Sequence, residues 1–285
     1  MRNPGVSWNR LLADWLATAL MALTAIVVIA PLFAILFYLV YQGVGSLNWA
    51  FLTHTPAPPG VVGGGMANAI VGSAMILLLA SVIGIPLGIG AGVFLSEYGR
   101  NRYGNIIRFT ADLLNGVPSI VIGMTVYALV VVPQKHFSLF AGSIALAIMM
   151  VPTITRSTEQ MLLMVPHSIR EAAWGLGVQR WRTTVSVVLA TARSGIITGI
   201  MLAFARVAGE TAPLMFTAFG NQYWNFRTNQ PTAALPLQIF TYGTSPFDEW
   251  HTQAWAGALV LIALIVGSVA AVRVVARKGA LKGAA

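Results

Sequence analysis

The sequence lacks cysteine and has few charged side chains. Without a thiol, the chain can form no disulfide and can offer no thiolate ligand to a metal ion. Only 9% of its 285 residues are charged, and just eight are Asp or Glu. Soluble domains have about 25% charged residues, so this composition excludes an ordinary water-soluble protein.

The motifs of several enzyme classes are also missing. A phosphate-cradling loop of the Gly-x-x-x-x-Gly-Lys type needs glycine directly before lysine, yet Lys135, Lys278 and Lys282 follow Gln, Arg and Leu. No Gly-x-Ser-x-Gly elbow occurs. No cluster of His, Asp and Glu has metal-ligand spacing. We therefore expect a non-catalytic chain that binds no cofactor itself.

What the sequence has in abundance is apolar surface. Hydrophobic residues make up 57% of the chain, and its mean hydropathy is +0.77. A helix needs about 20 apolar residues to cross a bilayer. Six segments meet this length, which predicts an all-α membrane protein with six transmembrane helices. The six candidate segments are Trp15–Thr53, Thr55–Ser96, Leu113–Gln134, Phe137–Thr155, Ser194–Ala218 and Thr252–Val272.

The net charge of +9 predicts an orientation rather than a nucleic-acid partner. If both termini are cytoplasmic, the inner segments contain 14 of the 17 Lys and Arg residues, and the outer loops contain only Lys135 and Arg227. This bias follows the positive-inside rule. The apolar run after the first two arginines is too long for a signal peptide, so we expect an uncleaved first helix.

Small residues and breakers recur at informative positions. Gly84, Gly88 and Gly92 lie four residues apart, as do Gly195 and Gly199, a spacing that favours close helix packing. The outer segment 42–66 is rich in Gly and Pro and predicts either an ordered turn or a flexible linker. The outer loop 220–251 is either a cap or partner surface, or a solvated connector.

The longest inner loop, residues 165–190, predicts two short helices separated by a glycine. Ser168 and Glu171 have the spacing of a capping box, and Gly177 is placed to end the first helix. An amphipathic stretch from Gln179 to Val188 follows. A rigid, partly apolar projection of this kind needs a partner or a headgroup surface to cover it.

The residues of this loop carry a family resemblance. Glu171-Ala172-Ala173 followed by Gly177 resembles the EAA loop of binding-protein-dependent ABC transporter permeases, although Ala190 stands where that family often has proline. The resemblance implies the type I importer permease (MetI-like) fold. It also implies that the loop seats in a groove of a cytoplasmic ATPase and transmits its closure to the membrane helices.

Two further segments narrow the resemblance. Gly116-Val117-Pro118-Ser119-Ile120-Val121-Ile122-Gly123 and Arg206-Val207-Ala208-Gly209-Glu210-Thr211-Ala212-Pro213 are similar to the PstA type of phosphate-transport permease rather than the PstC type. The similarity covers the chain from about Ala67 onward.

This narrower resemblance implies a set of partners in a bacterial inner membrane. They are a homologous PstC-like permease, a PstB-like ATPase dimer that binds ATP and Mg, and a PstS-like extracytoplasmic phosphate-binding protein. It also implies three parts of the chain: residues 1–66 with the first helix and outer loop, a permease core over 67–275, and a basic cytoplasmic tail over 276–285.

Ionisable residues inside the apolar segments are the candidates for a substrate pathway. Each costs about 2.5 to 3.5 kcal/mol at the bilayer centre, so the presence of both Arg206 and Glu210 in one apolar segment indicates a charged pathway. On one helix Arg206 and Glu210 would lie about 40° apart in azimuth, and Arg156 and Glu159 about 60° apart. Each pair would therefore lie on one face of its helix. Arginine's planar fork suits an oxyanion, and a nearby carboxylate would neutralise it between cycles. Arg206 is predicted to contact phosphate, with Glu210 as its counter-ion and Arg156 with Glu159 as a second station.

Structural interpretations of these residues remain open. Two sets of residues could be ion pairs that brace helices, namely Arg206 with Glu210 and Arg156 with Glu159. Pro118 frees a carbonyl, and Asn115 and Ser119 could bond either that backbone or a substrate oxygen.

The sequence also indicates one further ion pair and is compatible with three other functions. Arg108 and Asp112 are predicted to form an interfacial pair near the inner end of the third segment. The alternatives are a permease for sulfate or molybdate, an ion-coupled secondary carrier, and a structural subunit that only anchors the ATPase.

Overall fold

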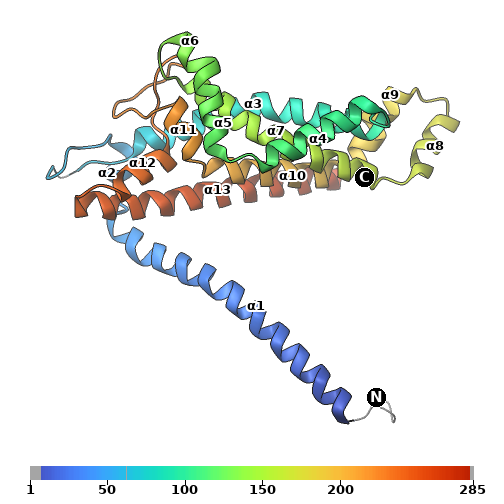
Figure 1. The fold of residues 1–285 in the computed structure, drawn as a ribbon, viewed down its shortest axis with the longest axis horizontal. Helices are drawn as coiled ribbons and strands as arrows, with labels where there is room; N and C mark the ends of the chain where they lie inside the picture. The colour runs from blue at the N-terminus through green and yellow to red at the C-terminus, as the bar shows by residue number, and fades with distance from the viewer. Residues whose placement is uncertain (1–7, 62, 283–285) are drawn as a thin grey trace.

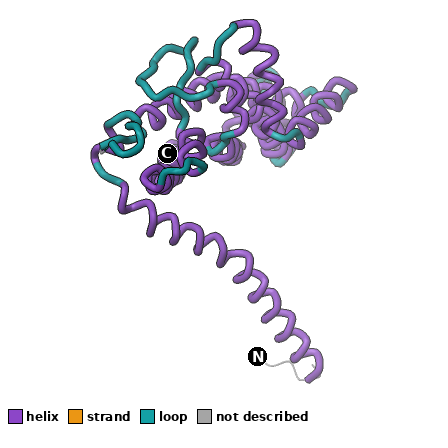
Figure 2. The backbone as a smooth tube through the Cα atoms, turned by 60° about the vertical axis from the view of Figure 1, so that its left-hand side comes forward, coloured by secondary structure: helices purple, strands orange, loops and turns teal. Residues whose placement is uncertain are grey.

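The computed structural model describes residues 8–61 and 63–282, with side chains as far as Val274. Figure 2 shows the described backbone as helices joined by loops, and its one isolated bridge joins Phe219 to Thr232. Five helices are long and apolar enough to cross a membrane, or six if one bent pair is counted as a span. The predicted all-α class is confirmed, and the predicted six spans are reached when the bent pair is counted as one span. The long helices are α1 (Trp8–Gly43), α3 (Ala67–Glu97), α7 (Leu139–Leu163), α10 (Leu189–Ala208) and α13 (Asp248–Lys282).

The helix α7 forms the centre of the bundle, and 67% of its most apolar window is buried. The close packing predicted at the glycine repeats is confirmed, and α7 is the helix that they contact. A Cβ on Gly88 would lie 2.7 Å from Ile154 Cβ, and a Cβ on Gly92 would lie 2.6 Å from Thr158 Cβ, so α3 packs closely along α7. From the other side, a Cβ on Gly199 would meet the side chain of Ser157.

The first helix leaves the bundle as a single rod (Figures 1 and 2). Its contact with the bundle is at its C-terminal end, where Gly43 abuts the backbone of Trp255 and Tyr38 meets the same indole edge-on at 5.2 Å. None of its most apolar window is buried within the chain. Such an apolar helix needs lipid or another subunit around it.

The Gly- and Pro-rich segment after α1 folds as an ordered turn over its described residues. It contains η1 (Val44–Ser46) and α2 (Trp49–Thr53). The chain then returns through hydrogen bonds from Gly65 N to Thr55 O at 3.1 Å and from Met66 N to Phe51 O at 2.9 Å. The loop 220–251 is likewise structured, since α12 (Leu235–Gly243) packs on α13.

The third predicted span, Leu113–Gln134, is wrong as a continuous helix. The chain instead forms α4 (Arg102–Gly116) and then α5 (Ser119–Val126), and the two helical segments are bent by 106°. Val117 takes an extended conformation with ψ of 131°, because the ring of Pro118 disfavours a helical residue before it. After α5 the helix continues through η2 (Tyr127–Val131) and α6 (Val132–Gln134).

The fifth predicted span, Ser194–Ala218, is also interrupted. The helix α10 ends at Ala208, and a separate short helix α11 (Ala212–Thr217) follows. Pro213 ends the longer helix because it has no N–H to donate to Gly209 and its ring would clash with that carbonyl. At its N-terminal end α10 is extended by α9 (Arg180–Thr183) and η3 (Thr184–Val188).

The predicted projection of two short helices is confirmed at one end of the bundle. Figure 1 shows α8 (His167–Gly175) and α9 beyond the ends of α3 and α7. The predicted basic tail 276–285 continues α13 as far as Lys282, and its side chains lie outside the described residues.

Candidate functional site

A line of polar side chains joins α4 to α7, which we call the polar seam. The two helices run antiparallel here, so residues spaced by three or four on α4 meet residues spaced by three on α7. Three contacts cross the seam: Arg108 Nε to Glu159 Oε1 at 2.6 Å, Arg156 Nε to Asp112 Oδ1 at 3.0 Å, and Thr153 Oγ1 to Asn115 Oδ1 at 3.0 Å.

Glu159 is the centre of the polar seam. Only 3% of its side chain is exposed, and its second oxygen, Oε2, lies 2.7 Å from Arg156 Nη1. The predicted pairing of Arg156 with Glu159 is therefore confirmed. Two guanidiniums thus flank one buried carboxylate, and Asp112 balances the second positive charge.

The predicted pairing of Arg108 with Asp112 is wrong. Arg108 instead reaches across to Glu159 and donates to the carbonyls of Leu95 at 3.0 Å and Gly99 at 2.9 Å. These bonds fix α4 to the end of α3 as well as to α7. The sequence shows the four-residue spacing but not the neighbouring helix that offers a more buried partner.

Arg206 and Glu210 do not share one helical face. Arg206 is exposed in the last turn of α10, whereas Glu210 is partly buried beyond its end. No hydrogen bond or ion pair joins these two side chains, or either of them to another described side chain. The prediction that the pair lies on one continuous helix is wrong, because the helix stops at Ala208.

The two segments with the narrower resemblance meet in space. A Cβ on Gly123 of α5 would lie 2.6 Å from Pro213 Cα of α11, so the helices touch backbone to backbone. Val207 and Leu214 belong to the same buried cluster as Ile122. The helices that follow the two breaks, α5 and α11, are thus packed together inside the bundle.

Polar groups remain available beside the first of these breaks. Asn115 accepts a hydrogen bond from Thr153, and its amide nitrogen makes none within the described residues. Ser119, at the start of α5, is partly buried and its hydroxyl has no partner there. The structure therefore does not use Ser119 to repair the helix break.

The projection formed by α8 and α9 is anchored by a residue that sequence reasoning missed. Arg170 of α8 is buried and donates to Val165 O at 2.6 Å, to Leu162 O at 3.0 Å and to Glu97 Oε1 at 3.0 Å. These bonds tie α8 to the ends of α7 and α3. One signal was available: Arg170 lies three residues before the buried Ala173 and so shares its face.

The start of α8 differs from the prediction and its end agrees with it. Pro166 precedes the helix and Ser168 makes no capping bond, so the predicted capping box is wrong. Gly177 has a φ of +79°, a conformation that glycine adopts without strain, and the chain turns there.

The outward face of this projection is uncovered. Glu171 and Ala172 are exposed, while Ala173 packs inward. Apolar side chains extend the exposed face, with Leu176 84% exposed and Trp181 57% exposed. The surface is therefore suited to contact with another protein.

Among the described residues no three His, Asp or Glu side chains form a group that could bind a metal ion. The polar seam is therefore a set of ion pairs and hydrogen bonds rather than a metal centre.

Comparison with known proteins gives consistent results. Residues 84–279 match the family model of the binding-protein-dependent transport system inner membrane component. The phosphate transport system permease protein PstA of Yersinia pestis is 50% identical over 80% of this chain and 77% of its own length. The probable PstA protein of Methanocaldococcus jannaschii is 34% identical over 90% of this chain and 91% of its own.

Solved structures resemble this chain in fold. A chain of a bacterial ABC transporter that imports the polysaccharide alginate matches with a TM-score of 0.65 at 13% identity, covering 95% of this chain and 98% of that one. The methionine ABC transporter MetNI in an inward-facing form matches with a TM-score of 0.56 at 18% identity, covering 75% and 94%.

Proposed function

We propose that this chain, which belongs to the binding-protein-dependent transport system inner membrane components, is the phosphate-conducting permease subunit of an ATP-driven importer. It has the predicted MetI-like permease fold. It is a multi-pass membrane protein. The observation that supports phosphate as the substrate most directly is the high identity, over most of the chain, to permeases named for phosphate transport.

The substrate pathway is proposed to include Arg206. Its guanidinium has no partner within the described chain and is exposed, so it can bind an anion or a group from a second permease subunit. A planar guanidinium binds two oxygens of a phosphate at once and stays charged at any working pH. Glu210, on the far side of the helix break, is the nearby carboxylate that limits how tightly an empty site binds anions.

The polar seam is proposed as a second station on this pathway. Arg156 is 30% exposed at the side chain and is already paired with Glu159 and Asp112. An oxyanion that approaches Arg156 would compete with these carboxylates, which favours brief contact over tight binding. The free amide nitrogen of Asn115 and the hydroxyl of Ser119 offer neutral donors beside it.

The projection around α8 is proposed to couple transport to ATP hydrolysis. The buried bonds of Arg170 connect α8 to α3 and α7, so a displacement of α8 moves the ends of both helices. Glu171, Ala172 and Gly177 lie on or beside the exposed surface that contacts the ATPase, while Ala173 anchors it. ATP and Mg bind to that partner.

The remaining partners follow from the family. A homologous PstC-like permease covers α1 and completes the pathway, a PstB-like ATPase dimer binds the inner face, and a PstS-like protein delivers phosphate to the outer face. The chain resides in a bacterial inner membrane with both termini cytoplasmic, the orientation that agrees with the distribution of its arginines.

Uptake of radiolabelled phosphate by the reconstituted complex tests the proposed substrate and energy source. Phosphate should accumulate only with ATP on the ATPase side, and ADP should not replace ATP. Arsenate, with the same shape and charge, should compete, whereas sulfate should compete weakly. Equal competition by sulfate would indicate another oxyanion permease, and uptake driven by a proton gradient alone would indicate a secondary carrier.

The proposed coupling surface can be tested separately. Leu176→Asp places a charge on the most exposed apolar side chain of the projection, so co-purification of the ATPase should fall by about tenfold or more. Phe226→Asp is a matched control, because Phe226 is 65% exposed in the loop that joins α11 to α12. Figure 1 shows these two helices at the opposite end of the bundle from α8. Equal ATPase recovery with both variants would contradict the assignment.

A further inference from the structure

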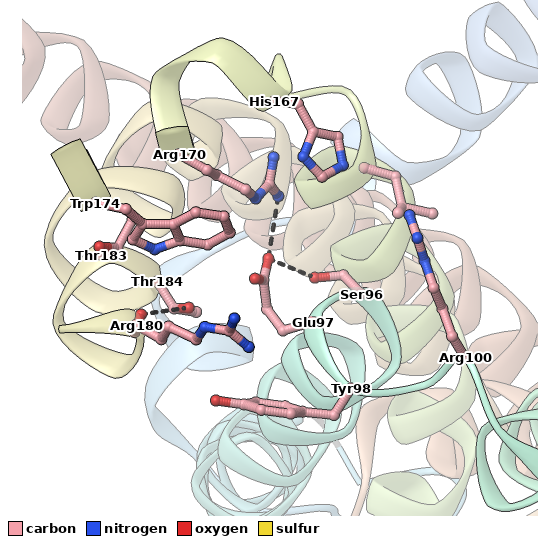
Figure 3. Close-up of a pocket in the computed structure, with 11 residues that line it drawn as sticks. Ser96, Glu97, Tyr98, Arg100, His167, Arg170, Trp174, Arg180, Thr183 and Thr184 are labelled. Carbon is pink, nitrogen blue, oxygen red and sulfur yellow. Dashed lines mark hydrogen bonds and ion pairs between the residues drawn. The ribbon is translucent and has the colours of Figure 1, made fainter. Parts of the chain in front are cut away.

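A cavity of about 230 Å³ lies at the base of α8, and we call it the basal cavity (Figure 3). It opens between the end of α3, the projection around α8, and the start of α9. Its polar lining includes Glu97, Tyr98, Arg100, His167, Arg170 and Arg180. It is separate from the polar seam, since none of the six side chains of that seam lines it.

The charges around the basal cavity are unbalanced. Three guanidiniums line it, from Arg100, Arg170 and Arg180, and Glu97 supplies the one carboxylate among its lining residues. Glu97 is already bound by Arg170 at 3.0 Å. Two positive charges therefore remain without an ion-pair partner in the described chain.

The two unpaired guanidiniums are held on different elements. Arg180 lies over the ring of Trp174, 5.4 Å from its centroid, which orients it at the start of α9. Arg100 follows the end of α3 and stands on the opposite side of the cavity in Figure 3. Both side chains are exposed, so an incoming ligand does not have to displace buried structure.

Two further polar side chains complete the lining. The ring of His167 and the hydroxyl of Tyr98 have no hydrogen-bond partner within the described residues, and Figure 3 shows both at the cavity. Two forked cations with further single donors need a ligand with several acceptor oxygens. A phosphate group has that chemistry, whereas a single carboxylate offers only two oxygens.

We propose that the basal cavity binds a phosphate group, supplied by free inorganic phosphate or by the headgroup of an anionic lipid. The ligand bridges Arg100 at the end of α3 to Arg180 of α9 and thereby holds the projection around α8 against the membrane helices. The site does not require that phosphate be the transported substrate, because a lipid headgroup provides the same group.

Hydrogen exchange of the complete transporter tests this site. The complex is prepared in an uncharged maltoside detergent without phosphate, and exchange is followed in backbone amides of residues 167–184. Either inorganic phosphate or dioctanoyl phosphatidylglycerol is then added, with chloride at equal ionic strength as the reference. Binding should slow exchange in this segment in a concentration-dependent manner.

Arginine variants locate the effect. Arg100→Gln and Arg180→Gln should each weaken the apparent affinity about tenfold, the expected loss for one charge-assisted contact. Arg102→Gln and Arg182→Gln are matched controls, because each lies two residues away, stacks on its own aromatic neighbour and lies outside the cavity. A response to phosphate identifies the free anion as ligand, and a response only to the lipid identifies the headgroup.

Other outcomes would overturn the proposal. These are no slowing with either probe, an equal loss in the cavity and control variants, or an effect of the cavity variants that arises only through loss of the ATPase from the complex. Arg206→Gln should leave the response intact, so a failure of the basal cavity is distinguishable from a failure of the proposed pathway.

Discussion

Replacing Glu159 with glutamine removes the charge that joins α4 to α7. The substitution keeps the shape of the side chain, so it tests electrostatics rather than packing. In the structure this carboxylate is 3% exposed and lies 2.6 Å and 2.7 Å from two guanidinium nitrogens. Glutamine can satisfy one of them with its carbonyl oxygen but offers no negative charge to either.

The expected loss follows from what each arginine retains. Removing one member of a fully buried ion pair costs about 3 to 5 kcal/mol. The side chains of Arg108 and Arg156 are 26% and 30% exposed, so water screens part of their charge. Without the carboxylate, Arg108 keeps its bonds to backbone carbonyls and Arg156 keeps its ion pair with Asp112. The expected loss of unfolding free energy is therefore lower, about 2 to 3 kcal/mol. At roughly 2 to 4 °C per kcal/mol, the melting temperature should fall by about 4 to 12 °C.

The measurement is thermal unfolding of the purified subunit in detergent, followed by tryptophan fluorescence. Glu171→Gln is the control, because Glu171 is exposed and makes no side-chain hydrogen bond in the described chain, and it should melt as the unaltered protein does. The Glu159→Gln and Arg108→Gln changes should together cost less than the sum of their separate losses. A melting temperature within about 1 °C of the unaltered protein would refute the electrostatic account of the polar seam.

Three other predictions concern separate parts of the molecule. Arg206→Gln should lower phosphate uptake at least about tenfold in a fully assembled complex, and normal uptake would remove this residue from the pathway. Arg170→Ala should uncouple ATP hydrolysis from phosphate uptake, because it removes the bonds that hold α8 to α3 and α7. Arg170→Lys should not restore coupling, because one ammonium cannot reproduce the three bonds. An unchanged ratio of hydrolysis to uptake in Arg170→Ala would contradict this role. Gly123→Ala should destabilise the subunit by about 1 to 3 kcal/mol, because the added Cβ would press on Pro213. Gly116→Ala is the control and should leave stability unchanged, because the space around Gly116 is open. Equal melting temperatures of the two variants would contradict the close contact.

Local features of the sequence predicted the outline of this protein well. The lengths of the apolar runs indicated the class and the number of spans, because any helix in lipid must be about 20 residues long. The pattern around Glu171 and Gly177 predicted the inner projection, because both the amphipathic spacing and the glycine turn are local. The glycine repeats predicted close packing, although the sequence did not show that α7 is the helix they contact.

The helix breaks show where local reading fell short. Pro118 disfavours a helical conformation at Val117, although the apolar run continues through both residues. The helix α10 likewise ends before Pro213 within an apolar run. Hydropathy alone does not show these breaks, because proline interrupts the backbone without making the run less apolar.

What the sequence determined by itself is the membrane class, the set of apolar helices and the presence of charges among them, since these depend on composition and short-range spacing. Only the tertiary structure decided which charges pair. Glu159 binds Arg108, 51 residues away, and Arg170 binds Glu97, 73 residues away. A buried charge pairs with whichever opposite charge the packing of helices brings within about 3 Å, and spacing along one helix does not determine that packing.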